Sequence, residues 1–99
     1  MAAETNLDFE WDEDKAAANL KKHKISFEEA KTVFADSFSI TLDDPVHSLD
    51  EPRFVDIGES ADGEILVVSY AERKQKIRLI SCRKATKAER KVYEEREEF

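Results

Sequence analysis

The stretch EILVVSYAERKQKIRLISCRK, residues 64–84, determines the fold class. Its first half, Glu64–Glu72, contains Ile65–Val68, which is apolar on both faces and typical of a strand in the middle of a sheet. The residues 73–75 are short enough for a tight turn, and Lys76–Lys84 has the composition of a further strand. We therefore expect two neighbouring antiparallel strands.

Two further strands precede this pair. Arg53–Glu59 is expected to pair antiparallel with the strand after it, because Ser60–Gly63 is a four-residue turn that ends in glycine. In residues 38–42 the apolar Phe38, Ile40 and Leu42 alternate with polar residues, which predicts a strand with one buried face. Residues 43–52 contain two prolines and several acids and are expected to form a loop.

Helices are expected on both sides of these strands. After a short strand at 9–11, Asp12 is a typical N-cap for a helix over about 12–23, and Ser26 with Glu29 forms a capping box that begins a second helix. Thr86 and Glu89 form another such box, which begins a C-terminal helix. The pattern predicts an α+β fold with two N-terminal helices, an antiparallel β-sheet meander and a C-terminal helix.

The length of 99 residues predicts a single domain over 1–99, with 1–7 as a disordered leader and 94–99 as an acidic tail. The net charge of −7 argues against nucleic-acid binding until its distribution is considered. Residues 1–72 carry a net charge of −12, whereas residues 73–93 carry +8. The basic groups are concentrated as a local phosphate-binding surface requires, although an ordinary solvated strand and helix would carry similar charges.

Several classes of protein are excluded. Cys82 has no partner, so we expect no internal disulfide, a reducing compartment and a cytoplasmic location. We expect neither a signal peptide nor a membrane span, because the start of the chain lacks an apolar run and the longest one covers only 65–68. Two distant histidines and one cysteine predict no zinc site, and Gly58 and Gly63 form no phosphate loop, so no metal or cofactor is expected.

A set of short motifs in a fixed order resembles a known family. The motifs are Phe9–Asp12 leading into a helix, Asn19–Ala30, Arg53–Gly58 (R-x-x-x-I-G), Tyr70–Arg73 (Y-x-x-R), Ile77–Thr86 and Glu89–Tyr93 (E-R-x-x-Y). Together they resemble the BrnT-like family over about residues 9–94. Two positions depart from its pattern, since Lys24 stands where the family usually has glycine and Cys82 where it usually has alanine.

The resemblance implies a fold and a function. The fold would be similar to that of RelE and ParE toxins, with a twisted antiparallel sheet and helices against one side. The protein would be the toxin of a bacterial type II toxin–antitoxin pair and an endoribonuclease acting on cellular RNA. A BrnA-like antitoxin would neutralise it, and operator DNA would be reached only through the DNA-binding domain of that antitoxin.

RNA transesterification requires a base, an acid and cations that stabilise the charge on phosphorus. Arg78 lies between Ile77 and Leu79, so its side chain should point away from the core and could hold a phosphate, unless it is only a surface arginine. Arg53 and Arg73 lie at strand ends and are further catalytic candidates. His23 is a candidate for proton transfer, or alternatively the C-terminal cap of its helix.

Arg83, Lys84 and Tyr70 are candidates for RNA binding, by charge and by base stacking. Arg83 has the parity of Ile77 and Leu79, so it should point toward the helices unless the strand ends or bulges first. The alternative to RNA binding is that Arg83 pairs with a carboxylate of the terminal helix, such as Glu89. His47 lies in a polar loop with no pattern around it, and we expect it to be solvated.

Three functions remain open at the level of sequence. The first is a metal-independent endoribonuclease. The second is a catalytically degenerate toxin that only binds an antitoxin and acts as a co-repressor module, which would have no use for the cations at Arg78, Arg83 and Lys84. The third, a gyrase-poisoning toxin of the ParE type, shares the fold but has no support in the motifs.

Overall fold

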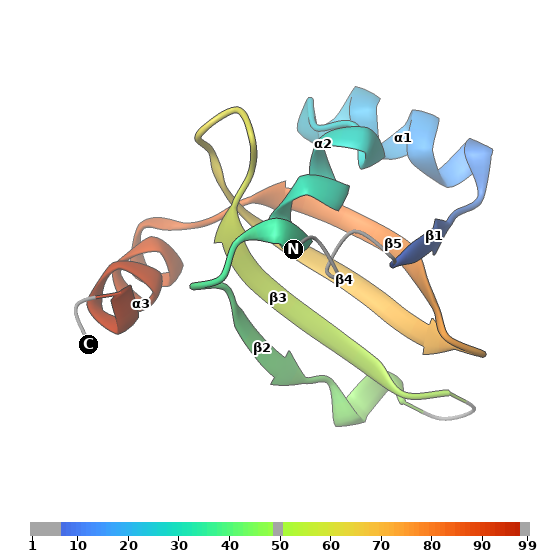
Figure 1. The fold of residues 1–99 in the computed structure, drawn as a ribbon. Helices are drawn as coiled ribbons and strands as arrows, with labels where there is room; N and C mark the ends of the chain where they lie inside the picture. Colours follow the sequence, from blue (N-terminus) through green and yellow to red (C-terminus); the bar gives the residue numbers. More distant parts are fainter. Residues whose placement is uncertain (1–6, 49–50, 98–99) are drawn as a thin grey trace.

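The computed structural model describes residues 7–48 and 51–97. Within these residues, three α-helices and a five-stranded sheet make up an α+β fold (Figure 1). In chain order the elements are β1 (Asp8–Glu10), α1 (Glu13–His23), α2 (Phe27–Thr32), the 3-10 turn η2 (Val33–Ala35), β2 (Ile40–Asp43), the 3-10 turn η3 (Pro45–His47), β3 (Arg53–Glu59), β4 (Ile65–Arg73), β5 (Lys76–Lys84) and α3 (Lys87–Glu97).

The strands lie in the order β1-β5-β4-β3-β2, and β2 to β5 form the expected antiparallel meander. Two expectations need correction. The sheet is mixed and not purely antiparallel, because β1 runs parallel to β5 with Phe9 opposite Ile77. The helices α1 and α2 do not precede the sheet but lie between β1 and β2. These strands are opposite edges of one sheet, so the chain must cross a face of it, and the two helices make that crossing.

The main core lies between this pair of helices and one face of the sheet. Tight packing includes the close approach of η2 to β3 at Gly58, where an added Cβ would lie 2.9 Å from side-chain atoms of Ser39 and Val33. The buried members of the core are Ile25, Phe27, Ala30, Val33, Leu66, Val68, Tyr70, Ile77, Leu79 and Cys82. We call the other side of the sheet the outer face.

A smaller cluster covers part of the outer face. Tyr93 of α3 packs there against Ile40, Ile57 and Val67, which come from β2, β3 and β4. The hydroxyl of Tyr93 also donates a hydrogen bond to Asp36 Oδ2 (2.6 Å). The helix α3 therefore covers only one end of the outer face, and in Figure 1 it lies away from α1 and α2.

Local signals account for the helix starts. The Asp12 carboxylate accepts hydrogen bonds from the N–H groups of Asp14 (2.8 Å) and Lys15 (3.1 Å), as expected of an N-cap. Ser26 Oγ accepts from Glu29 N (3.0 Å), but the Glu29 carboxylate accepts from the Ser60 hydroxyl (2.7 Å), so that half of the capping box is replaced by a tertiary contact. Lys24 ends α1 with φ 64°, the left-handed region that favours glycine.

One local expectation is wrong. Phe38 precedes β2, and Phe38 and Leu42 are about half exposed, so only Ile40 of the three alternating residues is buried. The cause is that β2 is an edge strand and the cluster around Tyr93 reaches only its beginning. The residues expected as an acidic tail, 94–99, are helical as far as Glu97, where α3 ends, and the last two lie outside the described residues. The expected leader lies outside the described residues except for Leu7.

Candidate functional site

The strand register places two arginines side by side on the outer face. Arg53 on β3 lies opposite Ala71 on β4, Ala71 lies opposite Arg78 on β5, and Arg78 lies opposite Glu10 on β1. Neighbouring strands are about 4.8 Å apart, so β3 and β5 are about 10 Å apart and both arginines can reach one ligand over Ala71. Ala71 is fully buried and has no long side chain to separate them.

A bulge in β5 brings a third arginine to the outer face. Tyr70 lies opposite Leu79 while Ser69 lies opposite Ser81, so Ile80 is an extra residue in the ladder. The bulge reverses the parity of the strand, and Cys82 consequently points into the core with Leu79. The spacing of Arg83 from Leu79 alone would require Arg83 to point toward α1 and α2. Because of the bulge, it lies on the outer face instead.

The outer face is hollowed next to these residues. A hollow of about 200 Å³ is lined by Asp44, His47, Arg53, Phe54, Ser69, Tyr70, Ile80 and Ser81. A second hollow of about 320 Å³ shares Asp44, Ser69 and Ser81 with it and extends to Arg83 and Glu89. We call the two together the outer groove. Its floor offers the hydroxyls of Ser69 and Ser81, which can bond phosphate oxygens.

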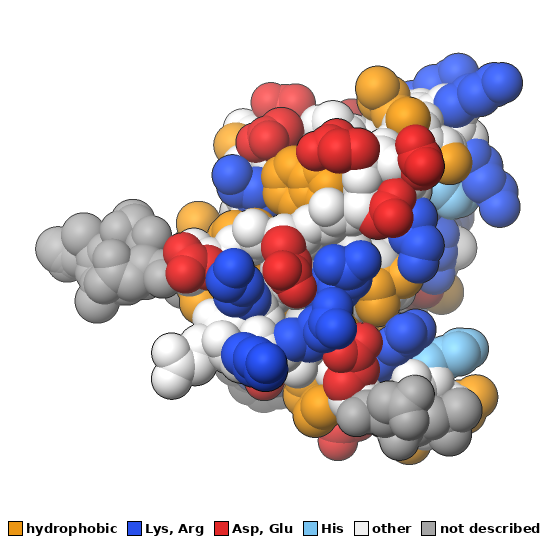
Figure 2. All heavy atoms as spheres, turned by 90° about the vertical axis from the view of Figure 1, so that its right-hand side faces the viewer, with side chains coloured by type: hydrophobic (Ala, Val, Ile, Leu, Met, Phe, Trp, Pro, Cys, Tyr) orange, Lys and Arg blue, Asp and Glu red, His pale blue; other side chains and the backbone are white. Residues whose placement is uncertain are grey.

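Carboxylates partly neutralise the cations at one end of the groove. Glu10 Oε2 lies 3.7 Å from guanidinium nitrogens of both Arg73 and Arg78, and Glu51 Oε1 lies 2.9 Å from Arg73 Nε. Figure 2 shows the same mixture of basic and acidic side chains on the side of the molecule where the β4–β5 turn lies. Arg53 differs, since it has no ion pair among the described residues and its buried Nε has no hydrogen-bond partner there.

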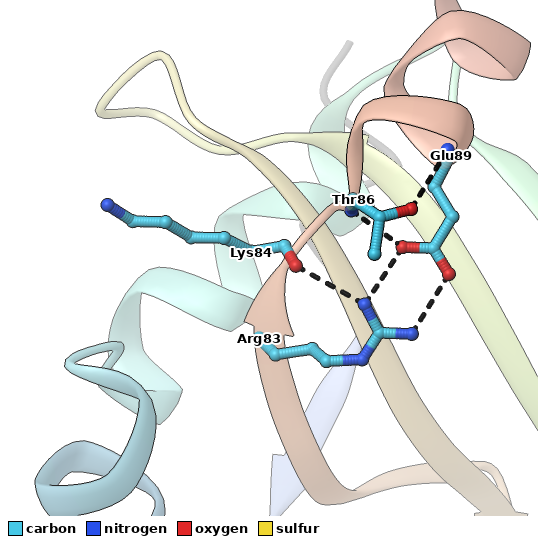
Figure 3. A network of polar contacts seen from close by, with 4 residues as sticks. All are labelled: Arg83, Lys84, Thr86 and Glu89. Carbon is cyan, nitrogen blue, oxygen red and sulfur yellow. Dashed lines mark hydrogen bonds and ion pairs between the residues drawn. The ribbon is translucent and has the colours of Figure 1, made fainter.

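Arg83 is held by a carboxylate at the other end. Its Nη1 and Nη2 donate to Glu89 Oε1 (2.8 Å) and Oε2 (2.9 Å), and Glu89 also completes the capping box with Thr86 (Figure 3). The hydrogen bonds from Arg83 lower the pKa of Glu89 to about 2. The alternative pairing of Arg83 with Glu89 is thus confirmed, although the pair lies on the outer face.

Two of the residues expected to bind RNA do not offer a free side chain to the groove. Tyr70 is 5% exposed, and its hydroxyl donates to Asp56 Oδ1 (2.9 Å). Burial and the Asp56 carboxylate raise the pKa of Tyr70, so its ring belongs to the core and cannot stack on a base. Lys84 lies opposite Leu66, on the side of the sheet that carries α1 and α2, and is close to Glu64 (3.8 Å).

The structure separates His23 from the arginines. His23 ends α1, which packs against β5 from the side of Cys82, whereas Arg78 points to the outer face. The histidine that lines the outer groove is His47, whose Nδ1 lies 3.0 Å and 3.1 Å from the two carboxylate oxygens of Asp44. The sequence did not identify His47 as a candidate, although its spacing of three residues from Asp44 is compatible with the contact between their side chains.

Other chemistry has little support in the part of the chain that the structure describes. Burial raises the pKa of the Cys82 thiol to about 12, so this side chain is no nucleophile. Among residues 7–48 and 51–97, no group of three or more His, Cys, Asp or Glu side chains could hold a metal ion. None of the helices described is long and apolar enough to cross a membrane. The groove instead combines cations, hydroxyls and one imidazole, which can bind a phosphodiester and accept a proton.

The chain was compared with known proteins. The structure is similar to the crystal structure of the ribonuclease toxin BrnT of Brucella abortus, with a TM-score of 0.63 and 21% identity over 83% of this chain and 100% of that one. Comparison with curated proteins gives no match. The family model of BrnT, the ribonuclease toxin of type II toxin–antitoxin systems, matches residues 11–89. The chain therefore belongs to the BrnT family of ribonuclease toxins.

Proposed function

We propose that this member of the BrnT family is a metal-independent endoribonuclease that cleaves cellular RNA by transesterification in the outer groove. The observation that carries the proposal is the row Arg53, Ala71 and Arg78, in which two guanidinium groups flank a small buried residue on the open side of the sheet. Arginine forks match the oxygens of a phosphodiester, and no other described row brings two of them so close.

The chemistry of the step explains why two cations are needed. The 2′-oxygen of a ribose attacks the adjacent phosphorus, and the phosphorane that forms carries one more negative charge than the phosphodiester. Arg53 and Arg78 would stabilise that charge, as donors placed in advance do in other transition states. Arg73 would orient the RNA at the end of β4, and Arg83 would attract its backbone at the margin of the groove, whereas Lys84 lies on the other side of the sheet.

The arginine that tests this assignment is Arg78. Arg78→Ala should lower the rate of RNA cleavage by about 100-fold or more, the usual scale for the loss of one transition-state donor. Arg78→Lys should restore the rate only in part, because lysine lacks the bidentate fork. The free energy of unfolding should change by less than about 1 kcal/mol, since a partly exposed ion pair contributes little.

The measurement is cleavage of purified total RNA, with urea unfolding of each variant alongside. Lys91→Ala is the matched control, because Lys91 is an exposed cation on α3 outside the groove. Full cleavage by Arg78→Ala would place the site elsewhere, and equal losses in the Arg78 and Lys91 variants would indicate diffuse attraction of RNA without a defined site.

Membership of a type II toxin–antitoxin family implies an antitoxin partner. We propose that this partner is BrnA-like, that operator DNA is contacted only through it, and that the complex acts in the cytoplasm. The arrangement of helices against a largely antiparallel sheet supports the proposal that the fold is similar to that of RelE toxins.

One observation favours the second candidate function, a degenerate toxin that only binds its antitoxin. Arg73, Arg78 and Arg83 all have carboxylate partners within the described residues, which weakens their attraction for RNA. This candidate requires that the unaltered protein leave RNA intact at every concentration while still binding its antitoxin. Cleavage by the unaltered protein that depends on Arg78 would eliminate it.

A further inference from the structure

The loop between β2 and β3 holds a histidine over the start of β3. Asp44 N donates to Arg53 O (3.0 Å), and Arg53 N donates to Ser48 Oγ (3.0 Å). Ser48 Oγ in turn donates to Asp44 O (2.6 Å). These hydrogen bonds fix η3 to the backbone N–H and carbonyl of Arg53, which lines the groove. The side chain of His47 on this turn therefore has a defined position relative to Arg53.

The imidazole of His47 is oriented by Asp44. Both carboxylate oxygens of Asp44 lie within hydrogen-bond distance of Nδ1, at 3.0 Å and 3.1 Å. A carboxylate at Nδ1 keeps the proton on that nitrogen, so that Nε2 carries the lone pair in the neutral ring. No described residue bonds Nε2, and the His47 side chain is 64% exposed, so a ligand in the hollow can reach this nitrogen.

The surroundings of His47 suit proton transfer to and from a phosphodiester. The charged groups that face it in the hollow are Asp44 on its own loop and Arg53 on β3. The residues that face it from β4 and β5 are uncharged: Ser69, Ile80 and Ser81. A base at the position of His47 would lie beside Arg53, which would hold the phosphate. The other histidine, His23, lies on the opposite side of the sheet.

We propose that His47 is the general base of the cleavage step and that Asp44 is its positioning residue. The inference rests on the proposed ribonuclease function. His47 Nε2 takes the proton of the ribose 2′-hydroxyl while the 2′-oxygen bonds to phosphorus and the bond from phosphorus to the 5′-oxygen breaks. The products are a 2′,3′-cyclic phosphate and a 5′-oxygen that is protonated from solvent, and the imidazolium then releases its proton to solvent.

The test compares variants of the full chain. His47→Asn keeps a donor for Asp44 but cannot accept the proton, so single-turnover cleavage of purified total RNA should fall by about 100-fold or more. The rate of the parent should rise with pH, because a base must be deprotonated to act, and this limb of the profile should be lost in His47→Asn. Binding of a mixed-sequence 2′-O-methyl RNA, which cannot be cleaved, should change by less than about threefold, because only the proton acceptor is removed.

Three companion variants sharpen the comparison. Asp44→Asn should lower the rate, because the carboxylate that orients the imidazole is lost, while binding of the uncleavable RNA stays within about threefold of the parent. Val46→Ala, an exposed change in the same turn, should leave both rate and profile as in the parent. His47→Ala should regain part of its rate with added imidazole, which separates a lost base from a disturbed fold.

The inference fails if His47→Asn keeps the parent rate and pH profile while Arg78→Ala is inactive; the proposed function would then stand without it. Loss of the limb in His23→Asn in place of His47→Asn would also overturn it. A parent protein that cleaves no RNA would instead refute the proposed function, and the inference would fall with it.

Discussion

Asn19 is a single residue that ties the two layers of the fold together. It is 6% exposed and donates to the carbonyls of Ile25 (3.0 Å) and Cys82 (2.8 Å), while its own carbonyl accepts from Cys82 N (3.0 Å). In the described part of the chain, the pairing of β1 with β5 ends at Glu10, opposite Arg78, so Cys82 has no strand neighbour on that side. The Asn19 amide takes the place of a peptide group of the missing strand.

Asn19→Ala should therefore lower the free energy of unfolding by about 3 kcal/mol, since it leaves buried backbone groups without partners. Urea unfolding measures this loss. Lys22→Ala, an exposed change in the same helix, is the control and should cost less than about 0.5 kcal/mol. A loss below about 1 kcal/mol in the Asn19 variant would mean that water replaces its hydrogen bonds.

The sequence predicted the orientation of Arg78 and the partner of Arg83, but it did not predict the face on which Arg83 lies. Arg78 points away from the core, as its place between Ile77 and Leu79 indicates. The face of Arg83 could not be known, because it depends on one extra residue in β5 that no local pattern marks. His47 is exposed, as expected, but its place in one hollow with Arg53, Ser69 and Ser81 is a tertiary property that no local pattern indicates.

The helix α3 is the element whose position depends most on ionised groups. Glu89 joins it to Arg83 and Thr86, and the Tyr93 hydroxyl joins it to Asp36. Burial alone would raise the pKa of Asp36, but hydrogen bonds from Glu59 N, Tyr93 and Phe38 N outweigh it and hold that pKa below the ordinary value. Both carboxyl groups therefore favour the docked helix in their charged forms.

Glu89→Gln should lower the free energy of unfolding at pH 7 by about 1–2 kcal/mol, because it removes a charged cap and an arginine partner. The pKa of Glu89 falls from 4.5 to about 2 on folding, so its contribution is present above pH 4.5 and is lost as the pH falls toward 2. The stabilities of the parent and the variant should consequently converge over that range.

Urea unfolding between pH 3 and 7 follows this convergence, and Glu95→Gln, an exposed change in α3, serves as the control. A constant difference between the parent and Glu89→Gln over this range would show that the Glu89 charge does not stabilise α3.

Elements with strong local signals were predicted well, since the caps at Asp12, Ser26 and Thr86 begin the helices where they should. The parallel pairing of β1 could not be predicted, because a strand of three residues carries no register information and its neighbour β5 lies 66 residues further along. The partial exposure of β2 depends on how far α3 reaches, which is also a tertiary property.

Across the whole molecule, charge is distributed so that RNA can approach in few places. Residues 1–72 carry −12 and would repel a polyanion, whereas residues 73–93 carry +8 and include β5 with Arg78 and Arg83. Carboxylates beside these arginines moderate the attraction, so the outer face should favour a phosphate that Arg53 and Arg78 bind together over loosely bound RNA.

Transesterification by side chains alone requires no metal ion and leaves characteristic ends on the RNA. These ends can be identified after the purified protein cleaves total RNA in excess EDTA. We expect undiminished cleavage, with 5′-hydroxyl and 2′,3′-cyclic phosphate ends. Loss of cleavage in EDTA, or fragments that carry 5′-phosphate and 3′-hydroxyl ends, would contradict it.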